Sequence, residues 1–278
     1  MNQSLRVPCA YQGGKQRVAS QIVDEILALG RGPTTRFYDL CCGSGAVSIE
    51  LVNRGVDPSM ITMLDLSSWG TFWTAIGSGS FKRDTFDELL SQVPADKRAV
   101  KKHMQYLSKL STEDREAELY PLLQACSFGG KQIWHNGKSW ENAFFRDYWE
   151  PTATSVRRSP ANPMQPSPQE LQRRIHALVQ GMHGIRCLKA DISEILLEDI
   201  SNDSVVYIDP PYADTTGYGF KFDVLTFAGE FRKKSQVPLF VSEGVPLAKD
   251  AALLKFGGAK GGISGSKKGK HEEWLSRL

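Results

Sequence analysis

The segment SVVYIDPPYAD, at positions 204–214, joins a strand-forming run to groups that can hold an amine. The run SVVYI is mainly apolar and β-branched, which is typical of a buried strand. Asp209 follows it, and Pro210 and Pro211 stiffen the turn because each proline fixes its φ. The Asp209 carboxylate and the Pro210 carbonyl can then both accept hydrogen bonds beside the ring of Tyr212. This combination suits a planar group that carries an NH2, such as an adenine turned out of a duplex.

A glycine turn upstream, DLCCGSG, indicates a site for a nucleoside-containing cofactor. Asp39 ends a predicted strand, and Gly43 and Gly45 lie in the turn to a predicted helix. Glycines there let a ligand approach the backbone, and the helix N-terminus offers N–H groups to an anionic group. Asp65 ends the next predicted strand, at a position where an acid can hold ribose hydroxyls. Two glycines after a strand can also serve the turn alone, so both interpretations stay open.

The N-terminal AYQGGK is a second glycine loop ahead of a predicted helix, and it contains Tyr11, Gly13, Gly14 and Lys15. It can be a loop that only starts the helix. It can also be a lid in which Tyr11 packs on a cofactor and Lys15 meets a carboxylate or phosphate.

These segments require an α/β sheet to bring them together. Strands are predicted over 36–41, 60–64, 185–190, 205–208 and 238–242, and helices over 16–29, 46–54 and 169–182. The order strand, glycine turn, helix, strand predicts a βαβ unit with a parallel sheet. The pattern changes over 72–184, to a polar helical stretch over about 86–123, an aromatic hairpin-like segment and a proline-rich loop. We therefore expect a sheet domain from 1–71 and 185–278 with an inserted, mainly helical region at 72–184.

Composition sets wider limits. The 278 residues, 41% hydrophobic and 23% charged, predict a soluble protein of one large domain or one domain with an insertion. No apolar run approaches a membrane span and no signal core is present, so we expect a cytoplasmic protein without a membrane partner. Five cysteines without a CxxC pair and five scattered histidines predict neither a disulfide framework nor a metal site. The net charge of +3 does not by itself indicate a nucleic-acid partner.

The insertion carries basic and aromatic residues interleaved, a mixture that suits a DNA backbone and an unstacked base. The candidate DNA-binding residues are Lys131, Lys138, Arg146, Arg157 and Arg158. The rings among them are Trp134, Trp140, Phe144, Phe145, Tyr148 and Trp149, and they can equally form the core of the insertion. The basic excess from position 255 onward can be a solvated tail or a phosphate contact.

The motifs YQGGK, DLCCGSG, MLDLS, KADIS and DPPY resemble, in content and order, those of the Dam-like (α-group) N6-adenine DNA methyltransferases. The aromatic insertion is similar to that of bacteriophage and prophage members. The resemblance implies a Rossmann-like class I methyltransferase sheet with an inserted target-recognition region that contains a hairpin. It also implies S-adenosylmethionine as cofactor, base flipping, and double-stranded DNA as partner of a monomer or weak dimer.

The resemblance further implies roles for individual residues. Those matching the cofactor site are Tyr11, Gly13, Gly14, Lys15, Asp39, Cys41, Gly43, Gly45, Asp65, Asp191, Ile192 and Asp209. Asp65 matches the residue that binds the ribose, and Asp191 one near the cofactor adenine. The catalytic segment matches Asp209, Pro210, Pro211 and Tyr212. The family usually has phenylalanine where this chain has Cys41, so packing against the cofactor must be made up elsewhere.

Two other functions are open at this point. The chain could methylate another planar amine or amide, in RNA or protein, although such enzymes favour Asn at the position of Asp209. It could also be an inactive relative that occupies DNA or blocks a host protein, although the intact DPPY and glycine motifs argue against this. A role in shielding phage DNA rests on the resemblance alone.

Overall fold

The computed structural model describes residues 4–30, 32–112, 114–210, 222–254 and 272–278, and its centre is a seven-stranded sheet. The strands follow the order β5 (Arg186–Leu188), β2 (Ile61–Leu64), β1 (Arg36–Leu40), β6 (Ser204–Ile208), β7 (Leu239–Glu243), β9 (Trp274–Arg277) and β8 (Ala252–Leu253). Neighbours from β5 to β7 are parallel, and β9 is antiparallel to both β7 and β8. The predicted parallel α/β sheet is therefore confirmed, whereas β8 and β9 are additions to it.

The central strands are buried on both faces because helices cover the sheet on both sides. Alternate residues of a strand point to opposite faces. Accordingly, Val205 and Tyr207 of β6 belong to one core, and Val206 and Ile208 belong to the other. This double burial explains why these strands read as nearly continuous apolar runs in the sequence.

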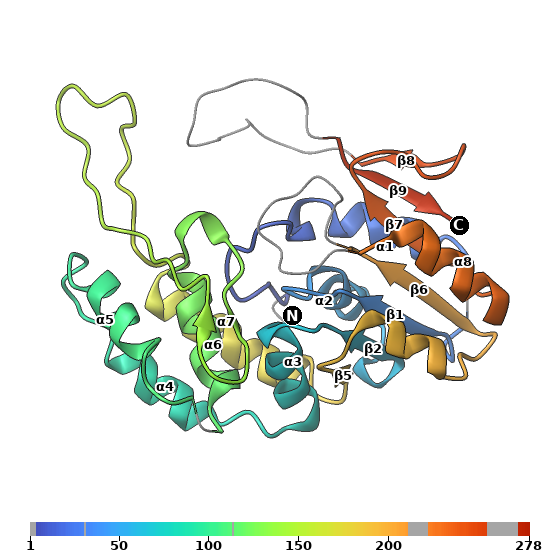
Figure 1. The fold of residues 1–278 in the computed structure, drawn as a ribbon, viewed down its shortest axis with the longest axis horizontal. Coiled ribbons are helices and arrows are strands. Elements are labelled where there is room, and N and C mark those ends of the chain that lie inside the picture. Colours follow the sequence, from blue (N-terminus) through green and yellow to red (C-terminus); the bar gives the residue numbers. More distant parts are fainter. Residues whose placement is uncertain (1–3, 31, 113, 211–221, 255–271) are drawn as a thin grey trace.

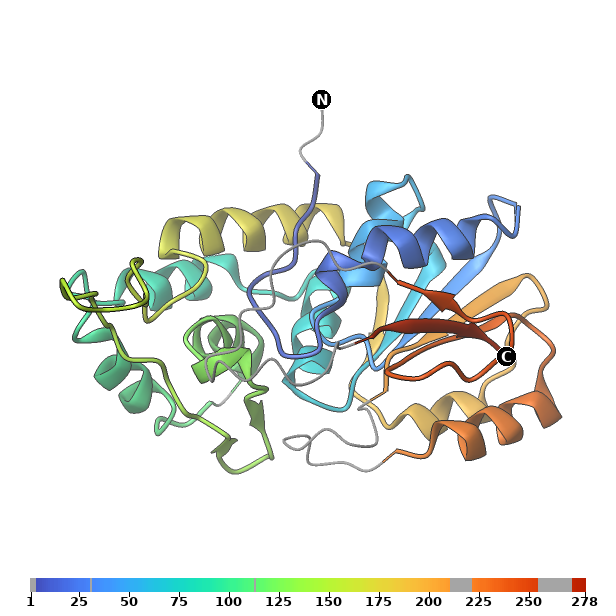
Figure 2. The ribbon, with the colours of Figure 1, turned by 90° about the horizontal axis from the view of Figure 1, so that it is seen from above.

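Three helices lie on one face of the sheet, and a 3₁₀ helix and one α-helix lie on the other (Figures 1 and 2). The first set is α1 (Ala19–Leu27), α2 (Ala46–Asn53) and α3 (Ser68–Ser78). The opposite face is covered by the 3₁₀ helix η4 (Ile192–Leu197) and by α8 (Val224–Lys234). Helices α1 and α2 were predicted, whereas α3 and α8 were not.

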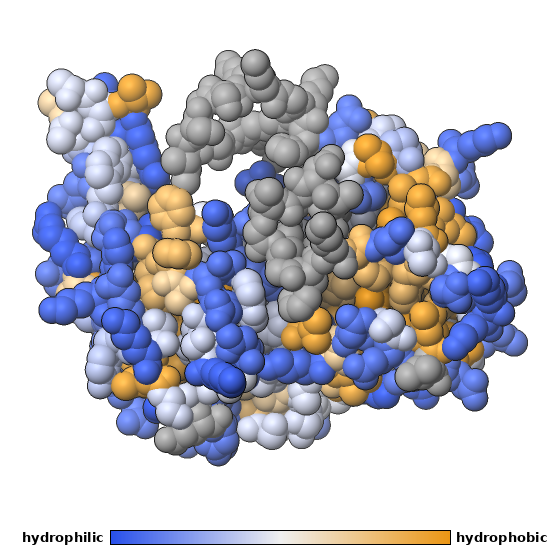
Figure 3. Space-filling model, viewed as in Figure 1, coloured by the Kyte–Doolittle hydropathy of each residue, from blue (hydrophilic) through white to orange (hydrophobic). Residues whose placement is uncertain are grey.

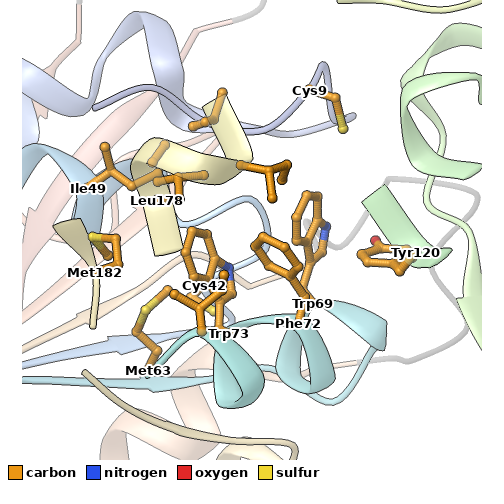
Figure 4. Packing of buried hydrophobic residues seen from close by; sticks show 14 of the residues in the cluster. Cys9, Cys42, Ile49, Met63, Trp69, Phe72, Trp73, Tyr120, Leu178 and Met182 are labelled. Carbon is orange, nitrogen blue, oxygen red and sulfur yellow. The ribbon is translucent and has the colours of Figure 1, made fainter. Parts of the chain in front are cut away.

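Helix α3 is buried over most of its circumference, with only Thr74 and Ser78 exposed. Trp69, Phe72 and Trp73 point from it toward α7 (Pro168–Gly181) and α6 (Glu116–Ala125), with Tyr120 of α6 beside Trp69 (Figure 4). Its other side packs on β5. Because the polar edge of this helix is so narrow, its amphipathic period is weak in the sequence. The predicted boundary between residues 71 and 72 falls inside this helix.

The inserted region contains four helices and a hairpin among its described residues: α4 (Arg83–Ser91), α5 (Val100–Leu107), α6 (Glu116–Ala125) and α7 (Pro168–Gly181), with β3 (Trp134–His135) paired to β4 (Trp140–Glu141). The stretch predicted as helical over 86–123 divides into three helices because Pro94 and the polar run after Leu107 interrupt it. The hairpin and the proline-rich loop are confirmed. That loop rises as a long arm between β4 and α7 (Figure 1).

Within the described ranges, no helix combines the length and the apolar character needed to cross a bilayer.

Candidate active site

A cavity of about 600 Å³ opens at the carboxyl ends of β1, β2 and β6. Small-molecule sites usually measure about 300–1,000 Å³. Twelve predicted site residues line it: Tyr11, Gly13, Gly14, Lys15, Asp39, Cys41, Gly43, Asp65, Asp191, Ile192, Asp209 and Pro210. Among the predicted catalytic and cofactor-binding residues of the described chain, Gly45 alone is not a lining residue. Pro211 and Tyr212 lie outside the described residues.

Asp39 connects the end of β1 to α2. Its Oδ2 accepts hydrogen bonds from the Ser48 backbone N–H at 3.2 Å and from the Ser48 Oγ at 2.6 Å. Burial raises the pKa of Asp39 to about 6, against the opposing effect of these donors. The residue therefore fixes the helix and also presents a carboxylate to the cavity.

Asp65 fixes two backbone turns at the cavity wall. Its Oδ2 accepts the Gly43 N–H at 2.8 Å, and its Oδ1 accepts the Ser67 N–H at 2.9 Å and the Ser67 Oγ at 2.5 Å. Burial raises the pKa of Asp65. Each carboxylate oxygen has room for more than one donor, so Asp65 can still accept a ligand hydroxyl.

The two glycines of the turn have different roles. Gly43 lines the cavity at φ +49°, and a Cβ there would lie 2.9 Å from the Tyr11 ring. Gly45 has φ +72°, and a Cβ there would lie 2.4 Å from the Trp73 indole. Gly43 thus keeps Tyr11 close, whereas Gly45 makes room for the core of α3.

Cys41 adopts φ +61°, in the left-handed region that non-glycine residues seldom occupy. Burial raises the pKa of its thiol well above the usual value, so the side chain is a neutral, small group at the cavity wall. This agrees with its interpretation as a small apolar residue.

Asp209 ends β6 and lies against a buried lysine. The Lys15 Nζ is 2.5 Å from the Asp209 Oδ1 and 3.5 Å from the Glu273 Oε1. The Asp209 N–H donates to the Leu40 carbonyl at 3.2 Å, which anchors the residue to β1. Burial raises the pKa of Asp209 to about 7, Lys15 opposes this, and Glu273 adds to it.

The sequence interpretation missed several lining residues, among them Ser67, Gln132, Phe222 and the pair Glu272 and Glu273. The glutamates precede β9, a short strand after a glycine-rich segment, and only the residues EEWL could have pointed to them. Gln132 comes from the inserted region. That region meets the N-terminal loop where the Gln12 N–H donates to the Gly130 carbonyl at 2.7 Å.

Four of the five predicted DNA contacts are exposed: Lys131, Lys138, Arg157 and Arg158. Arg146 is half-buried and donates to the Asn162 and Ser127 carbonyls, and burial lowers its pKa. Arg146 therefore stabilises the backbone of the insertion.

Of the aromatic residues in the insertion, some form its core and others are exposed, as a DNA contact requires. Trp140 and Phe145 are buried in the core, whereas Phe144 is 71% and Trp149 39% exposed.

Comparison with known proteins adds one match. The family model of the D12 class N6 adenine-specific DNA methyltransferases matches residues 11–235. This range contains Tyr11, the glycine turn and Asp209, and it ends before β7 and the glutamates at 272 and 273. No match was found among curated proteins.

Proposed function

Because this chain belongs to the D12 class N6 adenine-specific DNA methyltransferases, we propose that its cavity holds S-adenosylmethionine beside the adenine to be methylated. Membership implies methylation of adenine N6 in DNA with S-adenosylmethionine as donor. The observation that carries the proposal is the convergence of Lys15, Asp39, Asp65 and Asp209 on one cavity at the strand ends.

The residues present fit the cofactor. Asp65 offers acceptor capacity for ribose hydroxyls, and Asp39 a carboxylate for a cationic group. Asp191 and Ile192 lie at the wall next to β5, and Gly43 keeps the backbone open beside the Tyr11 ring. When bound, S-adenosylmethionine supplies a methyl group activated by a positively charged sulfur.

Asp209 and Pro210 are the acceptors for the adenine amino group in this proposal. That nitrogen is a poor nucleophile because its lone pair is shared with the ring. Two hydrogen bonds donated to the carboxylate and the Pro210 carbonyl increase the availability of the lone pair and fix its direction. Asp209 can also take the proton that the nitrogen loses, because its pKa of about 7 lies near neutrality.

The inserted region, assigned to 72–184, would bind double-stranded DNA with a flipped target base. Its arm is held by backbone hydrogen bonds between Trp149 and Ala161, at 3.1 and 2.8 Å. Arg157 and Arg158 lie near the arm's tip beside Val156, which is fully exposed. Figure 3 shows the arm standing clear of the rest of the surface, where it can reach a duplex. This arrangement supports phosphate contacts with DNA, which a monomer or a weak dimer could make.

Calorimetric titration with S-adenosylmethionine tests the cofactor assignment. We expect Asp65→Asn to weaken binding about tenfold or more, since it removes the charge and one acceptor. Asp57→Asn is the matched control. Asp57 binds Ser59 with the same pair of bonds, 2.8 Å from its N–H and 2.6 Å from its Oγ, but lies away from the cavity. Absence of binding by the unaltered protein, or equal loss in both variants, would contradict the assignment.

A further inference from the structure

We propose that Glu273 is a positioning residue that receives Lys15 when an amino group occupies Asp209. The inference rests on the proposed role of Asp209 and extends it to a residue outside the matched range 11–235.

Lys15 lies between two carboxylates that are associated with β6 and β9, the two strands that flank β7. Its Nζ is 2.5 Å from the Asp209 Oδ1, after β6, and 3.5 Å from the Glu273 Oε1, before β9. A third contact, to the Gly13 carbonyl at 3.1 Å, keeps the ammonium in the glycine loop. Only 6% of the lysine side chain and 8% of the glutamate side chain are exposed, against 18% for Asp209. Solvent therefore contributes little to stabilising the positive charge of Lys15.

Lys15 binds Oδ1, one of the two oxygens of the carboxylate that the substrate amine would use, and so competes with the substrate for it. Its ammonium donates to the Asp209 Oδ1, and an adenine amino group would donate to the same carboxylate. A buried ammonium cannot give up one carboxylate without another, because an unpaired buried charge is strongly destabilising. Glu273 is the second carboxylate within 4 Å of the Lys15 Nζ among the ion pairs described. A small shift toward it frees Asp209 and leaves the lysine paired.

Other groups that face Asp209 set the charge of the cluster. Asp39 and Cys41 come from the end of β1, and Tyr207 from β6. Burial raises the pKa of the Cys41 thiol and of the Tyr207 hydroxyl well above their usual values, so both are neutral near pH 7. Among the described residues, the main charges that act on Asp209 are therefore those of Lys15, Glu273 and Asp39.

Glu273→Gln keeps the size of the side chain and removes its charge. Glu273 raises the pKa of Asp209, and Lys15 lowers it. The variant should therefore lower the pKa of Asp209, and Lys15 should stay paired with it. Because the ionised form of Asp209 is the acceptor, activity is lost as the pH falls through its pKa. The acid limb of kcat/KM, which reports the pKa of the free protein, should move to lower pH by about one unit, while kcat on the plateau falls about tenfold.

Methyl transfer to unmethylated genomic duplex DNA, measured from pH 5 to 9, gives this profile. Glu230→Gln is the charge-matched control: its side chain is exposed, pairs with Lys233 on α8 at 2.6 Å and does not line the cavity. Its acid limb should stay where it is in the unaltered protein. Glu273→Asp retains a carboxylate and should restore the limb to the unaltered position. A Glu273→Gln limb that does not move, with a lower kcat, would show a merely structural role and overturn the proposal.

A readout without turnover separates this inference from the proposed function. The carbon-13 NMR titration of aspartate carboxyls in the free protein reports Asp209 directly, and its signal is assigned by its loss in Asp209→Ala. We expect that signal to titrate at lower pH in Glu273→Gln than in the unaltered protein. An unchanged titration would contradict the role of Glu273. A changed titration in a protein that transfers no methyl group would instead contradict the role of Asp209 as acceptor.

Discussion

Asp209 has its properties because of what surrounds it at the end of β6. Burial and Glu273 favour its neutral form, whereas Lys15 favours the charged form, and the balance leaves its pKa at about 7. An ordinary aspartate would be ionised at that pH and a poor proton acceptor. The motif DPPY predicts Asp209 but not this balance of charges. Lys15 lies 194 positions upstream of Asp209, and Glu273 lies in another segment, directly before β9.

The turn glycines offer a test at the same scale. Gly45→Ala should destabilise the fold by about 1–3 kcal/mol more than Gly55→Ala. Both positions have positive φ, +72° and +89°, so both alanines carry a strain of about 1–2 kcal/mol. Only at Gly45 would the new Cβ also meet Trp73, at 2.4 Å, whereas nothing lies within 4 Å at Gly55. Urea unfolding of the two variants measures the difference, and equal losses would contradict the packing role.

At the scale of elements, the parallel strands and the helices α1, α2 and α7 could be predicted, whereas α3 and α8 could not. The strands β1, β2, β6 and β7 carry apolar β-branched runs, and α1 has a clear apolar face. The exposed polar edge of helix α3 is limited to Thr74 and Ser78, because the sheet covers one side of the helix and the insertion another. Its aromatic residues were visible, but their partners come from distant parts of the chain.

The arm between β4 and α7 makes its own prediction. Arg157→Ala and Arg158→Ala should each weaken binding to duplex DNA and reduce its salt dependence by about one ion, as expected for a phosphate contact. In the free protein the two guanidinium groups donate to the Pro160 and Ala153 carbonyls, and each retains further donors.

Lys233→Ala on α8 is the control for the arm. That lysine is exposed and pairs with Glu230 at 2.6 Å, and both residues lie on α8 and not on the arm. Fluorescence titrations at several salt concentrations provide the comparison, with cofactor affinity expected to be equal in all variants. Arginine variants that bind DNA like the unaltered protein would exclude the arm from the interface.

At the scale of the whole molecule, the cavity is assembled from segments that meet only in the folded sheet. The glycine loop, the ends of β1, β2 and β6, and the segment before β9 all contribute lining residues. Sequence motifs predicted most of these segments, because the functional residues of each segment are close together in the sequence. The contributions of Gln132 from the insertion and of Glu273, directly before β9, depend on topology, and the only local sign of either is the run EEWL.

The measurement that tests the central claim most directly is methyl transfer by the unaltered protein and by Asp209→Ala. Each is incubated with labelled S-adenosylmethionine and unmethylated duplex DNA, and the DNA is digested to nucleosides. The account predicts labelled N6-methyldeoxyadenosine from the unaltered protein, and a loss of at least about a hundredfold in a variant that remains folded and binds the cofactor. Equal transfer by the variant, or label in any other nucleoside, would contradict it.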